Sequence, residues 1–398
     1  AFVREELAGA LGFRSGWPGL RGCWRVREFG VGRLGWAGSS SSGSHKMKKR
    51  LLSVLLLALV ADAEGSRCVG LSTVDVSSYV EKGGEEEERV ATRVAFDRAM
   101  REVGMVCVEG HGVPSGVIER VEEEARRYFD SAAKTSNARY GSEGFVARGV
   151  ESVGRSNKNA SIDRQPDAVE SFVFRSRPPQ RPEDDPERTG LQAIEESWCA
   201  AARAYWDAVR ALFDALLHVT ADVFGVDAAQ FLDAYDGDPS FALRFAHYPR
   251  GLPDVKRYGL HTDYLTFTVL RATQPGLQVR LRDGTFADVL PDPATLVVNA
   301  ADLTELWTNG AWRSAPHHVL PGSSTTQEAR HSIAFFTGPS SDFLVTPLPV
   351  GPTRLFDPVV AGDYLHGKIN PTTVVDDPPS GGGVCDDDAS SSSESRSE

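Results

Sequence analysis

The first half of the chain carries apolar residues at the spacing of amphipathic helices. Residues 89–104 and 114–130 both place apolar side chains three and four positions apart, with charged side chains between them. The first segment ends at Gly104, a typical helix-ending residue, and the second begins near Ser115, a candidate N-cap. Residues 191–225 repeat the helical spacing over a longer stretch. We therefore predict helices in these segments.

The second half changes to short apolar segments of the length of β-strands, separated by Gly, Pro and Asp. Eight such segments follow one another, which favours a β-sandwich or barrel. Helices before strands indicate an α+β domain covering about residues 68–372. The predicted strand segments are residues 241–249, 259–272, 276–282, 285–291, 295–307, 314–320, 330–339 and 342–349.

Both ends of the chain differ from this pattern. Within a leader of residues 1–67, residues 47–63 combine a basic start, a short apolar run and small residues, as a secretory signal peptide does. The apolar run is too short for a comfortable membrane span. If Met47 is the true start, we expect entry into the secretory pathway, and otherwise a cytoplasmic protein. Residues 373–398 are acidic and rich in Ser and Gly, which predicts a disordered tail.

Composition and charge narrow the class of protein. The 398 residues are 41% hydrophobic, which is ample for a packed core. The net charge of −12 argues against nucleic acid as a partner, because phosphate binding needs clustered Lys and Arg. The five cysteines lie far apart, so the spacing predicts neither a disulfide framework nor a zinc cluster. A small molecule is the expected partner.

Two polar residues interrupt the apolar segment 259–272. His261 and Asp263 are two positions apart, so on a strand both side chains would leave the same face. A third ligand is available in His317, or in the adjacent His318, at the start of another strand. Two histidines and one carboxylate form the metal-binding face of non-haem iron oxygenases. The alternative is an ordinary His–Asp pair on a surface strand.

The strand that follows His317 carries a second candidate site. Arg330 and Ser332 would share one face of this strand, where a guanidinium and a hydroxyl suit a carboxylate. Tyr248 could add a phenolic donor to the same carboxylate. The alternative interpretations are a surface arginine on an edge strand and a core tyrosine.

Several segments, taken in order, resemble a known family. The chain resembles the Fe(II)- and 2-oxoglutarate-dependent dioxygenases of the isopenicillin N synthase-like group over about residues 70–370. The resemblance implies a double-stranded β-helix, or jelly roll, in residues 236–372, with a helical N-terminal region in residues 68–235 packed against it. The segments are VDVSSYV, GMVCVEGHGVP, DAVESFVF, LRFAHYP, GLHTDYLTFTVL, PGLQV, LVVNAADLTELWTNGAWRSAPHHVL and RHSIAFFTGP.

The resemblance also implies which residues form the site. His261, Asp263 and His317 would bind the iron. The carboxylate of 2-oxoglutarate would meet Arg330 and Ser332, with Tyr248 assisting.

Two positions depart from the family pattern. The register that makes His317 a ligand puts His318 where the family usually has Arg, so we expect His318 to support the site from outside or to face solvent. Ala246 stands where many members have an Asn near the iron.

The implied activity is oxidation, usually hydroxylation, of a small organic substrate with release of succinate and carbon dioxide. Dioxygen is the implied co-substrate, ascorbate is a candidate reductant, and we expect a monomer. Two alternatives remain: an oxidase of the same group that does not use 2-oxoglutarate, and a jelly-roll binding module without catalysis.

Overall fold

The structure of the chain is a computed structural model. It describes residues 70–81, 83–131, 143–156, 166–184, 195–250, 257–272, 274–290, 292–320 and 329–369. The predicted leader, its signal peptide at 47–63 and the predicted tail at 373–398 lie outside the described residues.

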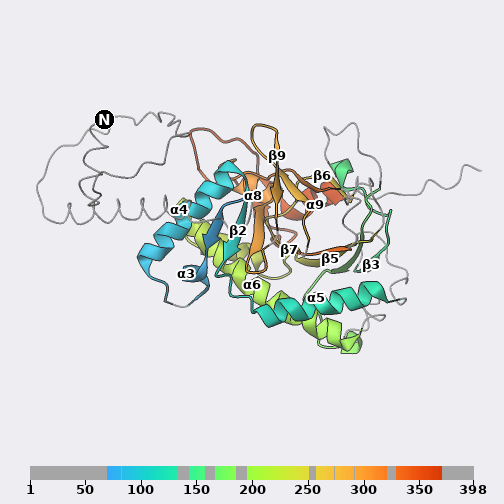
Figure 1. The fold of residues 1–398 in the computed structure, drawn as a ribbon. Coiled ribbons are helices and arrows are strands. Elements are labelled where there is room, and N and C mark those ends of the chain that lie inside the picture. Colours follow the sequence, from blue (N-terminus) through green and yellow to red (C-terminus); the bar gives the residue numbers. More distant parts are fainter. Residues whose placement is uncertain are drawn as a thin grey trace, which may run out of the picture. The chain divides into compact units, whose positions relative to one another are not determined.

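Two β-sheets form the centre of the described region (Figure 1). All neighbouring strands in them are antiparallel except β1 and β2, which are parallel. This is the predicted jelly roll. The larger sheet has the order β1 (Thr73–Asp75), β2 (Met105–Glu109), β10 (Leu296–Ala300), β7 (Phe267–Ala272), β12 (Arg330–Phe336), β5 (Ala242–Tyr248), β4 (Glu170–Phe174) and β3 (Gly144–Val146). The smaller sheet has the order β6 (Tyr258–His261), β11 (His317–Val319), β8 (Leu277–Arg280) and β9 (Phe286–Val289).

Three long helices cover the outward face of the larger sheet. They are α4 (Glu86–Glu102), α5 (Ser115–Asp130) and α6 (Glu196–Phe224), and α5 and α6 run side by side in Figure 1. Their predicted positions are confirmed. The shorter elements are α3 (Ser77–Val80), α7 (Ala229–Leu232), α8 (Asp302–Trp307), α9 (Ala361–Ile369), the 3-10 turns η2 (Val153–Ser156), η3 (Pro182–Asp184) and η5 (Asp233–Tyr235), and the strand pair β13 (Leu344–Val345) and β14 (Val359–Val360).

Strand alternation separates the core from the inner space between the sheets. On β12, Ile333 and Phe335 point outward and are almost fully buried against the helices. Phe335 meets Trp206 of α6 edge to face, with ring centroids 4.9 Å apart. The alternate residues of the same strand, Arg330 and Ser332, point inward. The core therefore lies on one side of the larger sheet, and polar side chains gather on the other.

Some predicted boundaries were wrong. Segment 259–272 is not one strand: β6 ends at His261, and Asp263 lies in the connection to β7. Segment 295–307 contains β10 and then the helix α8. Periodicity alone cannot separate a short apolar strand from the buried helix that directly follows it.

The N-terminal segments also differ in detail from the expectation. The region 68–235 contributes four strands, β1 to β4, to the larger sheet in addition to its helices. Ser115 is the first residue of α5 and caps nothing, because Pro114 is the N-cap. Gly104 does end α4 with a positive φ of 84°, and a Cβ there would lie 2.0 Å from the carbonyl oxygen of Arg313.

Two further features concern membranes and cysteines. Among the helices of the described residues, none is long and apolar enough to cross a membrane. Cys107 in β2 is disulfide-bonded, whereas Cys199 in α6 is a free, buried thiol. The wide cysteine spacing gave no indication of the bond at Cys107.

Candidate active site

Three side chains from the smaller sheet and its connections converge between the sheets. His317 of β11 pairs directly with His261 of β6, so the two imidazoles lie next to each other with ring centroids 4.3 Å apart. The Nε2 atoms of His261 and His317 lie 3.5 Å and 3.8 Å from Oδ1 of Asp263. All three residues are buried, and their ligand atoms lie within 4.8 Å of one another. The expected convergence of His261, Asp263 and His317 is therefore present, although Asp263 reaches it from a connection and not from a strand.

Backbone carbonyls fix which nitrogen of each imidazole faces the centre. Nδ1 of His261 donates to the carbonyl oxygen of Gly259 at 2.8 Å, and Nδ1 of His317 donates to that of Ala315 at 3.0 Å. A carbonyl only accepts, so both Nδ1 atoms carry hydrogen. Both Nε2 atoms are therefore left with a lone pair directed at the centre of the triad, as metal-binding histidines require.

The protonation states of the triad also suit a metal. Burial, together with the adjacent His261, lowers the pKa of His317 to about 4, so this imidazole is neutral at neutral pH. Burial by itself would raise the pKa of Asp263, but the interactions with His317, His261 and Thr268 outweigh it and hold that pKa below its usual range. A neutral imidazole and an ionised carboxylate are the forms that bind metal ions.

Two residues that the sequence analysis did not single out hold Asp263 in place. Thr268 of β7 donates its hydroxyl to Oδ2 of Asp263 at 2.6 Å, and the amide of Asn299 of β10 donates to the same oxygen at 2.8 Å. Oδ1 is left facing the two histidines. The signal available in the sequence was a polar residue inside an apolar strand, as in the run LVVNA that contains Asn299.

The predicted carboxylate-binding residues, Arg330, Ser332 and Tyr248, lie on neighbouring strands of the larger sheet. Arg330 of β12 pairs directly with Tyr248 of β5, and Ser332 pairs with Ala246. Arg330 is 1% exposed, yet its Nη1 atom has no hydrogen-bond partner among the described residues. Burial and the nearby Arg257 lower the pKa of Arg330, with only a partial offset from Tyr248. A buried cation with an unused donor favours a bound anion at this position.

The two groups line one small chamber of about 60 Å³. The triad with Asn299 and Thr268 lies on one side, and Arg330, Ser332 and Tyr248 lie on another. The donor set fits a ferrous ion, because two imidazoles and one carboxylate on one side leave the remaining positions open. It also fits an acid such as 2-oxoglutarate, because the orphaned guanidinium donor faces the space beside the triad.

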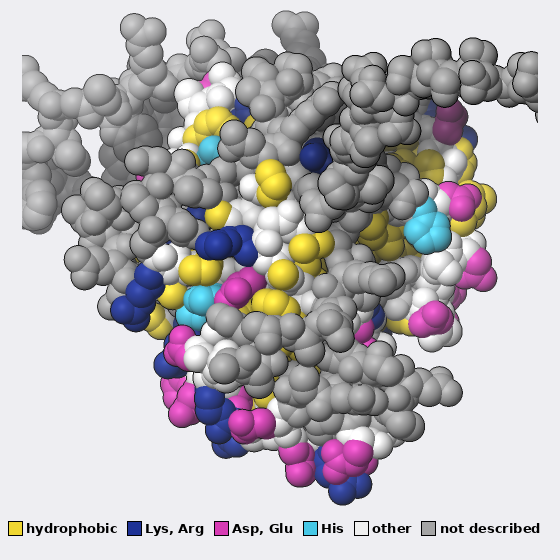
Figure 2. Space-filling model, turned by 90° about the vertical axis from the view of Figure 1, so that its right-hand side faces the viewer, with side chains coloured by type: hydrophobic (Ala, Val, Ile, Leu, Met, Phe, Trp, Pro, Cys, Tyr) yellow, Lys and Arg dark blue, Asp and Glu magenta, His cyan; other side chains and the backbone are white. Residues whose placement is uncertain are grey.

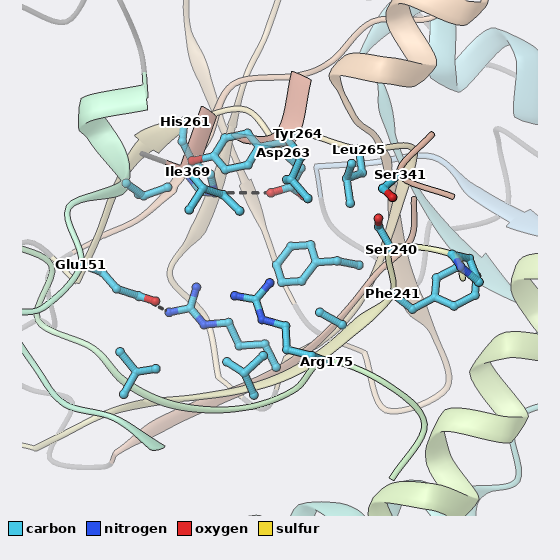
Figure 3. A pocket seen from close by; sticks show the side chains of 18 of the residues that line it. Glu151, Arg175, Ser240, Phe241, His261, Asp263, Tyr264, Leu265, Ser341 and Ile369 are labelled. Carbon is cyan, nitrogen blue, oxygen red and sulfur yellow. Dashed lines mark hydrogen bonds and ion pairs between the residues drawn. The ribbon is translucent and has the colours of Figure 1, made fainter. Parts of the chain in front are cut away.

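A large chamber of about 330 Å³ lies beside His261 and Asp263 (Figure 3). It shares Arg244, Tyr258, His261, Asp263 and Phe336 with the small chamber. Apolar side chains from β3, β4, β5 and α9 form much of its wall. A concave, mostly apolar space beside a reactive centre is the usual form of a substrate pocket.

A buried ion pair, Arg244 with Glu151, forms part of the lining of the large chamber. Arg244 of β5 binds the carboxylate of Glu151, and its Nη1 donates to the hydroxyl of Tyr258 at 2.5 Å. Burial raises the pKa of Glu151, against the opposing effects of Arg244 and Arg175. The sequence analysis missed this pair, although Arg244 is a charged residue inside the apolar run FALRF.

The structure also shows where His318 and Ala246, the two departures from the family pattern, lie. His318 points away from the triad: its Nε2 lies 2.9 Å from Oε1 of Gln278, and its ring stacks on Phe286. Ala246 is buried and lines the small chamber opposite Ser332, where a longer side chain would reduce the space.

Comparison with known families and proteins gives matches along the same region. Residues 238–339 match the 2OG-Fe(II) oxygenase superfamily, and residues 71–197 match the family described as non-haem dioxygenase in morphine synthesis N-terminal. Gibberellin 2-beta-dioxygenase 8 of Arabidopsis thaliana is 29% identical over 280 residues, covering 70% of this chain and 76% of that protein. Validamycin A dioxygenase of Streptomyces hygroscopicus subsp. limoneus is 29% identical over 304 residues, covering 70% and 80%.

A solved structure supports the fold. The dioxygenase for auxin oxidation of rice superposes with a TM-score of 0.57 at 23% identity, covering 75% of this chain and 95% of that one. The family matches include both the helical region and the segments that carry His261, Asp263 and His317. The chain belongs to the 2OG-Fe(II) oxygenase superfamily and is a non-haem Fe(II)- and 2-oxoglutarate-dependent dioxygenase.

Proposed function

We propose that His261, Asp263 and His317 bind the ferrous ion of this dioxygenase. The observation that carries the proposal is their convergence, with three ligand atoms within 4.8 Å and both Nε2 lone pairs directed inward. Thr268 and Asn299 orient Asp263 so that Oδ1 faces the metal position. Such outer hydrogen bonds keep a ligand in the geometry that the metal needs.

We propose that Arg330 and Ser332, assisted by Tyr248, bind the carboxylate of 2-oxoglutarate that lies away from the iron. The unused Nη1 donor of Arg330 supports this assignment, since a carboxylate would both pair with the buried charge and accept that hydrogen bond. The directly paired Tyr248 keeps the guanidinium in place, with Cζ 5.0 Å from its ring centroid.

The iron and 2-oxoglutarate, when bound, supply the oxidation: dioxygen converts 2-oxoglutarate to succinate and carbon dioxide and delivers one oxygen atom to a C–H bond of the substrate. The chain holds these partners, and the apolar wall of the large chamber keeps water from the reacting bond. The assigned residues therefore bind, orient and shield.

The experiment that tests the triad is Asp263→Ala, with Asp283→Ala as the matched control in the exposed turn between β8 and β9. Protein reconstituted with Fe(II) without air is analysed for bound iron, and then for succinate release in air with ascorbate present. Asp263→Ala should lose bound iron and at least about 10³-fold in succinate release, because one of three ligands is gone. Asp283→Ala should match the native protein in both.

Two outcomes would contradict these assignments. Native iron content and succinate release in Asp263→Ala would remove Asp263 from the ligand set. Oxygen consumption without any succinate would favour the oxidase that takes all electrons from its substrate, with Arg330 holding that substrate's own carboxylate.

We further propose that the chain acts as a monomer on a small molecule and not on nucleic acid. Among the described residues visible in Figure 2, basic side chains are interspersed with acidic ones, and the net charge is −12. Light scattering after gel filtration should give a mass near 43.1 kDa for the full chain. A mass of twice that value would overturn the monomer.

A further inference from the structure

The strand that carries His261 receives limited support from its own sheet. Among the described strands, β6 is at the edge of the smaller sheet and pairs on one side, with β11. That pairing is irregular: His317 is opposite His261, but Val319, two positions further on, is opposite a residue three positions earlier on β6. Such a bulge leaves one residue of β6 without a partner in the ladder. A bulged edge strand needs further contacts to keep a metal ligand in one position.

Asp167 supplies such a contact at the edge of β6. Its Oδ1 atom accepts the backbone N–H of Gly259 at 3.0 Å. Its Oδ2 atom accepts the backbone N–H of Val153, the first residue of η2, at 2.7 Å. Asp167 is 1% exposed, and both hydrogen bonds are buried. Hydrogen bonds from backbone N–H groups to a carboxylate are among the stronger ones in proteins, so Asp167 joins η2 firmly to β6.

Gly259 connects this contact to the iron site. Its N–H donates to Asp167, and its carbonyl oxygen accepts the hydrogen on Nδ1 of His261 at 2.8 Å. One residue therefore receives the support and orients the imidazole. If the backbone at Gly259 shifts, this carbonyl oxygen shifts with it, and Nε2 of His261 turns away from the centre of the triad. Asp167 lines neither of the two chambers, so its effect on the triad passes through this backbone.

Asp167 is itself fixed by neighbouring segments. Its backbone N–H donates to the carbonyl oxygen of Glu151 at 2.7 Å. Val169, two residues further on, is buried in a cluster with Tyr248 and Val319. The strand β4 then follows and pairs with β5. The side chain is thus held from both directions along the chain, as a group that positions another residue must be.

A second contact reaches the start of β6. The carboxylate of Glu151 binds Arg244, which donates to the hydroxyl of Tyr258 at 2.5 Å. The ring of Tyr258 meets that of His261 edge to face, with centroids 4.9 Å apart. Glu151 and His261 line the same chamber in Figure 3. Because this contact also supports β6, loss of the Asp167 side chain should loosen the strand without detaching it.

We propose that Asp167 is a positioning residue for the iron ligand His261. This inference rests on the proposed function, because it assumes that His261 binds the metal. Asp167 belongs to the N-terminal region 68–235, whereas the three ligands belong to residues 236–372. The N-terminal region therefore completes the iron site. Asp167 does for His261 what Thr268 and Asn299 do for Asp263, with a backbone residue in between.

The test compares two alanine variants that each remove a buried side chain bonded to backbone groups. Asp167→Ala removes the acceptor of two backbone N–H groups. Asn309→Ala is the matched control, because Asn309 is buried and lines neither chamber. Its side chain bonds backbone groups of Val350, Thr353 and Leu355. Denaturant unfolding records the loss of stability in each variant.

The first measurement is a titration of the metal-free protein with Co(II), without air and without 2-oxoglutarate. The visible absorption of Co(II) depends on its ligands and their arrangement, so it reports the position of the imidazole. Asp167→Ala should bind Co(II) about tenfold more weakly than the native protein, and with a changed spectrum. Asn309→Ala should keep the native affinity and spectrum although it loses stability.

The second measurement uses no metal. Hydrogen exchange followed by mass spectrometry reports the protection of the backbone amides in residues 257–263, which include Gly259. In Asp167→Ala this segment should exchange at least about tenfold faster, because one N–H has lost a charged acceptor. Asn309→Ala should leave the segment unchanged. Asp167→Asn keeps an oxygen for one of the two amides and should lie between native and Asp167→Ala in both measurements.

Native Co(II) affinity and spectrum in Asp167→Ala would overturn the inference, and so would equal losses in Asp167→Ala and Asn309→Ala. If Asp167→Ala does not fold, Asp167→Asn takes its place: it should bind Co(II) more weakly than Asn309→Ala, and equal binding would overturn the inference. Asp263→Ala separates this result from the proposed function. Native Co(II) binding in Asp263→Ala would contradict the proposed function, whereas lost binding there with native binding in Asp167→Ala would contradict this inference alone.

Discussion

The two faces of β5 and β12 differ sharply although they are built from alternate residues of the same strands. The outward face presents Phe245, Ile333 and Phe335 to the helices and is almost entirely apolar. The inward face presents Arg330, Ser332 and Arg244 to the two chambers. Side chains on the two faces are similarly buried. The degree of burial therefore does not tell which side chains stabilise the fold and which ones line the site. What separates the two faces is the kind of side chain, because the outward face is mainly aromatic and aliphatic and the inward face carries guanidinium and hydroxyl groups.

The inward face has the features of a site that binds ligands. Nη1 of Arg330 and Nε of Arg244 are buried without hydrogen-bond partners among the described residues. Such groups cost free energy in the unliganded protein and are satisfied when an anion binds. We therefore expect substitutions on the outward face to change folding stability and those on the inward face to change binding.

The largest effect is expected on folding stability, when alanine substitutions of the adjacent Phe335 and Phe336 are compared. Phe335→Ala should lower the free energy of unfolding by about 3–5 kcal/mol, because Phe335 is 0% exposed and packs on Trp206 and Phe241. Its neighbour Phe336 lines the large chamber and is only half-buried. Phe336→Ala should therefore cost much less stability and instead change the Michaelis constant for the oxidised substrate. Denaturant unfolding of both variants checks this, and equal losses of stability would break the contrast between the faces.

Arg330→Met should raise the Michaelis constant for 2-oxoglutarate about 100-fold, or about 2.8 kcal/mol, because it removes the proposed bidentate partner of the carboxylate. Folding stability should not fall, since the buried charge lacks a full set of partners among the described residues. The matched control is Arg271→Met on the outward side of β7, where Arg271 pairs with Glu122. It should leave that Michaelis constant unchanged, and an equal rise in both variants would show an indirect effect.

The outward face contains one histidine whose titration should be visible in stability. Burial first, and then the stacked His247, lower the pKa of His331 to about 4; Asp130 acts in the opposite direction, and Arg126 acts with His247. The unfolded chain would take up a proton near pH 6.5, so stability is fully present above that pH and is lost as the pH falls toward 4.

His331→Phe should remove this acid sensitivity. Between pH 7.5 and pH 5 the native protein should lose about 2 kcal/mol more than the variant, as the difference between the two pKa values requires. Other histidines titrate in both proteins, so the difference isolates His331. Parallel pH profiles of stability would contradict the assigned pKa.

The sequence allowed us to predict the helices and strands that show apolar periodicity, and the site residues that lie in short motifs. The helices α4 to α6 and a strand-rich second half follow from apolar spacing, whereas the jelly-roll class was implied by the family resemblance. The convergence of His261 with His317 was expected because both lie in short motifs on strands that such a fold brings together. The end of β6 at His261 was not predictable, because nothing in the apolar run marks where pairing stops.

The large chamber could not be predicted for a different reason. Its two arginines and Glu151 come from separate segments, and only the register of β4 against β5 makes Arg175 and Arg244 neighbours. Asn299 was missed because one polar residue in an apolar strand does not reveal which face it occupies. Residues that act through a cross-strand neighbour become visible only with the three-dimensional pairing.

Thr268 offers the smallest test, because it lies on the inward face and is expected to act on the iron position through Asp263. Its hydroxyl donates to Oδ2 of Asp263 at 2.6 Å, and Asn299 donates to the same oxygen. Thr268→Val keeps the shape and removes one of the two donors, so iron affinity should fall about tenfold. Thr304→Val is the matched control, because its hydroxyl binds the carbonyl oxygen of Thr266, away from the triad. Iron titration without air should show the loss only in Thr268→Val. An equal loss in Thr304→Val would mean that buried threonines support the fold in general, and that Asp263 needs only the Asn299 amide to keep its orientation.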